Sequence, residues 1–193
     1  MEQRFWQVEP SSLAAAQSDA AADGGSAGTA GSDATSAAGD ALEKRVAERL
    51  LGDETLRADL TDDEYQPLQD WALDSLHRRV AALADPATPE AETEIAHVAE
   101  CLSAVLRAAN DSIGRRADLD APAYAEALAA IRTEVESAIY GAEGPATDAQ
   151  RALEALLPEL AARKDDLDGA AATTALAAAL RGEYTAVGGE NTT

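Results

Sequence analysis

The sequence is short of several kinds of residue, and each shortage excludes a class of protein. Cys101 is the single cysteine, so no disulfide forms within the chain. No stretch of about 18 consecutive apolar residues occurs, which predicts that the chain has no transmembrane helix. The N-terminus lacks a basic region followed by an apolar run, so we expect no secretory signal and a cytoplasmic protein.

Basic residues are scarce and are almost all arginine. Lys44 and Lys164 are the only lysines, the acidic residues number 36, and the formal net charge is −21. Without a basic stripe that neutralises phosphates, direct binding to nucleic acid or to an anionic membrane is not expected. This composition resembles that of proteins from halophiles that accumulate salt. At about 1 M salt the Debye length is roughly 3 Å, so the self-repulsion of such a charge is screened.

Aromatic side chains are also few, whereas alanine is abundant. Aromatic residues make up 4% of the chain, and 48 of the 193 residues are alanine. Alanine, leucine, glutamate and arginine favour helices, and the residue types that favour strands are sparse. We find no strand-like alternation of useful length and no internal repeat. The expected fold class is all-α, a bundle of five or six helices with short connections.

Composition divides the chain into four segments. Residues 1–13 contain an aromatic stretch, MEQRFWQVEP, and residues 14–39 hold only small and polar side chains, which is typical of a disordered linker. Residues 40–184 carry the helical pattern and are expected to form the bundle domain. Residues 185–193 are expected to be a flexible tail.

Capping signals predict where the helices begin and end. The expected N-caps are Asp40, Thr61, Thr88 and Thr147. A further helix, from about residue 122 to 140, carries an apolar stripe made of Tyr124, Leu128, Ile131, Val135 and Ile139. Pro158 is expected to interrupt the helix that follows Thr147, and the last helix is expected to end near Arg181. Arg115 and Arg116 follow a helix end, where cations are favoured without further purpose.

Two acid-x-x-His pairs have the spacing of the ligands in ferritin-like di-iron proteins. Asp74 stands three residues before His77, and Glu94 stands three residues before His97. On a helical wheel Asp74, Glu94 and His97 point away from the apolar faces of their helices, whereas di-iron ligands project into the bundle. We therefore expect solvated surface residues here, and no cofactor.

A second pattern includes the single thiol. Cys101 follows His97 by four residues, so Glu94, His97 and Cys101 lie along one stripe of a helix. A Cys–His pair can serve as nucleophile and base, or as two metal ligands, with His77 or Asp74 completing a metal site. The alternative is that Cys101 is a small apolar residue at the edge of a helix interface and His97 lies at the surface.

The N-terminal segment has the composition of a tethered recognition peptide. Phe5 and Trp6, followed by Val8, precede the polar linker, although disordered segments usually lack aromatic residues. Aromatic anchors supply a large contact area at low entropic cost, and such contacts persist at high salt. We predict that these three residues bind a partner, and docking onto the protein's own bundle is an equal alternative.

These observations predict a non-catalytic helical adaptor or regulatory protein. It would bind protein partners through its bundle and its N-terminal aromatic segment. Two other functions stay open. One is a small metal- or thiol-dependent enzyme or sensor that uses Glu94, His97 and Cys101, and the other is a structural subunit of a larger protein assembly. A homo-oligomer is compatible with each of the three.

Overall fold

The computed structural model describes residues 30–136 and 147–184. Within these ranges the chain forms six α-helices and no strand, which confirms the expected all-α class. The helices are α1 (Ala30–Leu51), α2 (Asp62–Ala81), α3 (Pro89–Ala109), α4 (Ala121–Val135), α5 (Asp148–Ala162) and α6 (Gly169–Arg181). A 3₁₀ turn, Glu54–Leu56, follows α1, and a π-helical turn, Asn110–Gly114, extends α3. No helix in this part of the chain is long and apolar enough to cross a bilayer.

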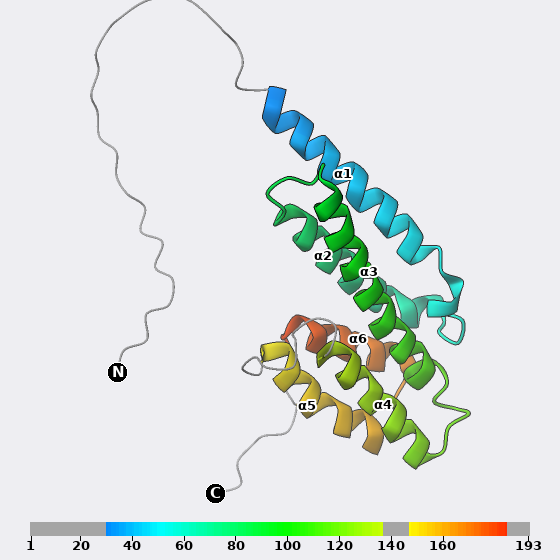
Figure 1. The fold of residues 1–193 in the computed structure, drawn as a ribbon. Helices are drawn as coiled ribbons and strands as arrows, with labels where there is room; N and C mark the ends of the chain where they lie inside the picture. Colours follow the sequence, from blue (N-terminus) through cyan, green and yellow to red (C-terminus); the bar gives the residue numbers. More distant parts are fainter. Residues whose placement is uncertain (1–29, 137–146, 185–193) are drawn as a thin grey trace, which may run out of the picture.

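The helices form two groups that share α2 and α3 (Figure 1). α2 and α3 form a hairpin, and α1 packs along both of them. α6 packs against α2, α4 packs against α3, and α5 packs against α4 and α6. The central hairpin therefore lies between α1 on one side and the group of α4, α5 and α6 on the other.

A single apolar cluster holds the helices together. Its most fully buried members include Leu56, Leu68, Leu76, Ile95, Leu106, Ile113, Leu128 and Ile131. Burial of one such side chain contributes roughly 1.5–3 kcal/mol. Every buried side-chain nitrogen or oxygen in the described ranges has a hydrogen-bond partner, so this core carries no unsatisfied polar side chain.

The predicted capping boxes at Thr61 and Thr147 are confirmed. Thr61 Oγ1 accepts a hydrogen bond from the backbone N–H of Glu64 at 3.3 Å, and Glu64 Oε2 accepts one from the backbone N–H of Thr61 at 2.8 Å. Thr147 and Gln150 exchange the equivalent bonds at 3.2 and 2.7 Å. Each box satisfies two backbone donors that the first turn of a helix leaves free.

The predicted start of the first helix is wrong. α1 begins at Ala30, not after Asp40, so residues 30–39 belong to a helix and not to a linker. Gly39 is buried where α1 crosses the end of the hairpin, and a Cβ on it would lie 3.6 Å from both Pro86 Cγ and Val80 Cγ1. This packing and the high helix propensity of alanine outweigh the polar composition. Glu43, on this helix, contacts His77 of α2.

The predicted break at Pro158 is also wrong. α5 runs unbroken from Asp148 to Ala162, with Pro158 exposed on its outer face. Proline removes one backbone hydrogen bond, but buried leucines on both sides of it hold the helix against the bundle. Ile139, the linker before residue 30 and the tail after residue 184 lie outside the described residues.

Candidate functional site

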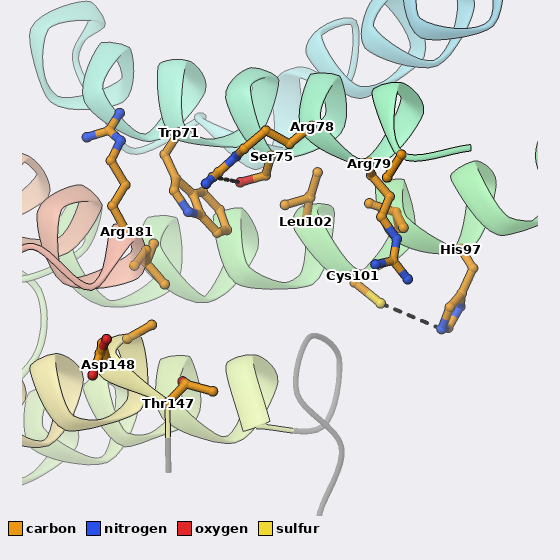
Figure 2. Close-up of a pocket in the computed structure, with 14 residues that line it drawn as sticks. Trp71, Ser75, Arg78, Arg79, His97, Cys101, Leu102, Thr147, Asp148 and Arg181 are labelled. Atoms are coloured by element: carbon orange, nitrogen blue, oxygen red, sulfur yellow. Dashed lines mark hydrogen bonds between the residues drawn. The ribbon is translucent and has the colours of Figure 1, made fainter. Parts of the chain in front are cut away.

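A pocket of the described bundle opens between α2, α3, the start of α5 and the end of α6 (Figure 2). Its volume is about 690 Å³, within the range of pockets that hold small molecules. Trp71, Val98, Leu102 and Leu180 supply its apolar surface. Trp71 is only 2% exposed, so it belongs to both the core and the pocket wall.

Three arginines and one carboxylate line this pocket, although acidic residues greatly outnumber basic ones in the whole chain. Arg78 donates from Nε to the carbonyl oxygen of Asp74 at 3.2 Å and from Nη2 to Ser75 Oγ at 3.4 Å. Arg79 Nε lies 3.2 Å from Glu94 Oε1. Arg181, in the last turn of α6, forms no ion pair with any residue in the described ranges.

The start of α5 adds to the positive character of the pocket. Thr147 is the N-cap of this helix, and Thr147, Asp148 and Ala149 line the pocket. The N-terminus of a helix carries a partial positive charge from its unpaired backbone N–H groups. Gly182 makes the close approach of α6 to α5 possible, because its φ of 77° is left-handed and a Cβ there would lie 3.3 Å from Ala149 N. Asp148 is the pocket's carboxylate, and it is bound to Arg151 at 2.6 Å.

The Cys–His pair lies at the edge of the same pocket. Cys101 Sγ is 3.8 Å from His97 Nε2, and a dashed line in Figure 2 marks this contact. Cys101 is 8% exposed, whereas His97 is exposed to solvent. Burial raises the pKa of the thiol above its ordinary value, and the charges of Glu100 and Glu134 raise it further. The thiol is therefore protonated at neutral pH, and a protonated thiol is a weak nucleophile.

The other predicted metal ligands do not join this pair. Glu94 is held by Arg79, and His77 Nδ1 lies 2.9 Å from Glu43 Oε2 on α1. Asp74 is exposed on α2. Among residues 30–136 and 147–184, no group of three His, Cys, Asp or Glu side chains is placed to hold a metal ion. The structure thus brings His97 and Cys101 together and leaves the proposed ligand set unassembled.

The predicted partner-binding residues Phe5, Trp6 and Val8 lie outside the described residues. The arginines around the pocket were not predicted from the sequence. Cations are scarce in this acidic chain, so the position of each arginine is a clue to where an anion could bind. This is the signal that could have pointed to the pocket.

A second cluster that the sequence did not reveal joins three parts of the bundle. Arg116 Nη2 lies 2.9 Å from Glu64 Oε1, and Arg116 Nη1 donates to the carbonyl oxygen of Ile113 at 2.7 Å. Burial alone would raise the pKa of Glu64, but hydrogen bonds from Thr61 and the charge of Arg116 outweigh it, so the pKa is lowered. A Cβ on Gly169, at the start of α6, would collide with both charged groups. The role of this cluster is structural, because the ion pair fills the space between its elements.

Comparison of the chain with protein-family models, with curated proteins and with solved structures gives no match.

Proposed function

We propose that this protein is a non-catalytic adaptor or regulatory protein that binds protein partners through its N-terminal aromatic segment and its helical bundle. The observation that carries the proposal is that the bundle forms its core from its own helices. Among the described residues, the apolar cluster extends from Leu42 to Tyr184. Phe5 and Trp6 are large aromatic side chains in a segment that precedes a stretch of small and polar residues, and side chains of this kind commonly anchor a partner.

The state of the reactive side chains supports binding over catalysis. The Cys101 thiol has a raised pKa, Glu94 is engaged by Arg79, and His77 is engaged by Glu43. A catalytic nucleophile or base needs the opposite, a pKa shifted toward the reactive form and a free approach to substrate. These contacts hold the helices to one another.

The cell compartment is part of the same proposal. We place the protein in the cytoplasm of a cell with a high internal salt concentration, because the chain carries a net charge of −21 and a single cysteine. Salt at that concentration screens long-range attraction between charged partners. Binding that depends on apolar anchors such as Phe5 and Trp6 is much less affected by such screening.

The test is a pull-down from a lysate of the native cells in about 1 M KCl. The baits are the intact protein, a Phe5→Ala/Trp6→Ala variant, and a Gln3→Ala/Gln7→Ala variant as a matched control in the same segment. We expect one partner to be retained by the intact bait and by the control, and lost by the aromatic variant. Equal capture by all three baits would show that the bundle alone binds, and capture by none would contradict the adaptor proposal.

A second candidate function, a thiol-based sensor, is favoured by the Cys101–His97 contact of 3.8 Å at the pocket edge. Alkylation by iodoacetamide, followed across pH, separates it from the adaptor proposal, because Cys101 is the only thiol. The adaptor proposal predicts slow alkylation with a midpoint above the ordinary thiol pKa of 9.0. Rapid alkylation at pH 7 that a His97→Gln substitution abolishes would favour the sensor.

A further inference from the structure

We infer that the pocket between α2, α3, α5 and α6 binds a small organic anion, in which a carboxylate or phosphate group is joined to an apolar body. The inference goes beyond the proposed partner binding and does not depend on Phe5 or Trp6. It rests on the charge of the three arginines that line the pocket, on the contacts that they make, and on the apolar side chains that line the same pocket. These arginines are Arg78, Arg79 and Arg181, and they are called the rim arginines below.

The charge of the rim is opposite to that of the chain. Acidic residues outnumber Lys and Arg by 36 to 15, yet three arginines and one aspartate line the pocket. Asp148 is paired with Arg151 at 2.6 Å and Arg79 is paired with Glu94 at 3.2 Å, so Arg78 and Arg181 supply the positive charge that no carboxylate in the described ranges pairs with. The N-terminus of α5 adds partial positive charge at the same place. The pocket is therefore a local positive region on an acidic protein, which attracts an anion.

Two of the rim arginines are free of carboxylate partners in the structure as described. Arg181 has no ion pair with residues 30–136 or 147–184, and the contacts of Arg78 within these ranges are with a hydroxyl and a backbone carbonyl. By contrast, Arg132, on α4, contacts two carboxylates, at 2.6 and 3.1 Å. A guanidinium presents a fork of N–H donors that matches the oxygens of a carboxylate or phosphate. Arg78 and Arg181, both labelled in Figure 2 among the residues that line the pocket, are therefore the candidates to bind such a group.

The interior of the pocket accepts the apolar body of the ligand. The indole of Trp71 and the side chains of Leu102, Val98 and Leu180 line it. A volume of about 690 Å³ suits a small molecule, and apolar walls with a few polar groups are typical of small-molecule sites. The protein's own N-terminal segment, with Phe5 and Trp6, is the alternative occupant of this pocket, and the titration described below separates the two.

The test uses the full chain with Trp6→Phe, so that Trp71 is the only tryptophan, and follows its fluorescence. The probes are decanoate below its micelle concentration, dodecyl phosphate, decanol and inorganic phosphate. We expect saturable binding of one molecule of decanoate or dodecyl phosphate, and binding of decanol that is at least about tenfold weaker. Preference for one of the two amphiphilic anions identifies the head group. Equal affinity for decanol, or no saturable binding of either anion, would overturn the inference.

Matched variants identify the residues that bind the head group. Arg78→Gln/Arg181→Gln should weaken decanoate binding by at least about tenfold, because charge-assisted hydrogen bonds are lost. Arg49→Gln/Arg115→Gln is the control, since it removes the same charge from two arginines outside the pocket. Circular dichroism verifies that both variants keep their helices. Equal weakening by both pairs would show that only net charge matters and would refute the site.

The same titration tests the alternative occupant. If decanoate binds only after Phe5→Ala and Trp6→Ala are introduced, the pocket of the intact chain holds its own N-terminal segment, and the inference is wrong. Unchanged affinity in that variant supports it. A failure of partner capture in the pull-down leaves this result untouched, so the two proposals fail separately.

Discussion

Removal of the Arg116 side chain should destabilise the bundle far more than removal of an exposed arginine. Arg116 bonds to Glu64 Oε1 at 2.9 Å and to the Ile113 carbonyl at 2.7 Å. The Glu64 side chain is 8% exposed and that of Arg116 is 26% exposed, so this ion pair is largely shielded from water. The Arg116→Ala substitution leaves the Glu64 carboxylate buried without its cation, although its hydrogen bonds from Thr61 remain.

The magnitude follows from this partial burial. Breaking a fully buried ion pair costs about 3–5 kcal/mol, whereas an exposed pair is worth about 0–1 kcal/mol. We expect Arg116→Ala to cost about 2 kcal/mol of unfolding free energy, and a double-mutant cycle with Glu64→Ala to give a coupling of about 1–2 kcal/mol. Arg132→Ala, at a surface pair with half-exposed side chains, is the matched control and should cost about 0.5 kcal/mol or less.

Urea unfolding followed by far-UV circular dichroism measures these energies. Because the pKa of Glu64 is lowered in the folded state, its contribution to stability is complete above its ordinary value of 4.5 and is lost as the pH falls through the lowered value. The coupling with Arg116 should therefore be present at pH 7 and vanish once Glu64 is protonated. A coupling below about 0.5 kcal/mol at pH 7, or one that is unchanged in acid, would refute the reasoning.

Three further substitutions or conditions test the rest of the fold. Pro158→Ala should stabilise the protein by about 1–2 kcal/mol, because an exposed proline inside α5 lacks a backbone donor. Pro89→Ala, at the first turn of α3, is the control and should change the stability little, and equal effects of the two substitutions in urea unfolding would contradict this. Leu106→Ala should cost about 3 kcal/mol by the same assay, because Leu106 is fully buried, and a cost below about 1 kcal/mol would mean that the site is not core. Raising KCl from about 0.1 to about 1 M should raise the melting temperature, because the net charge of −21 is then screened, and a flat or falling melting temperature would argue against self-repulsion.

Local features of the fold were predictable because their causes lie within a few residues of one another. The boxes at Thr61 and Thr147 each depend on a residue three positions later, and both appear in the structure. The apolar stripe of α4 is confirmed at the four positions that the structure describes, from Tyr124 to Val135. Such periodicity identifies a helix and its buried face without knowledge of the neighbouring helices.

The errors occurred where packing at a distance outweighed local preference. Residues 30–39 have the composition of a linker, but Gly39 packs against Val80 and Pro86 of the hairpin. Pro158 has a strong local tendency to break a helix, but the buried leucines around it keep α5 in place. Sequence separation hides both causes, since the contacts form only when distant helices meet.

The arginines show the same limit at the candidate site. Arg116 looked like an ordinary cation after a helix end, but its partner Glu64 lies in the first turn of a different helix. Arg78 and Arg181 are more than 100 residues apart in the sequence, and the packing of α6 against α2 brings them to one pocket. In a chain with so few cations, the contacts of each arginine distinguish one that stabilises the fold from one that can bind a ligand. Arg116 is held by the buried Glu64 carboxylate and by the Ile113 carbonyl and therefore serves stability. Arg78 and Arg181 have no carboxylate partner within the described ranges, so they can serve recognition.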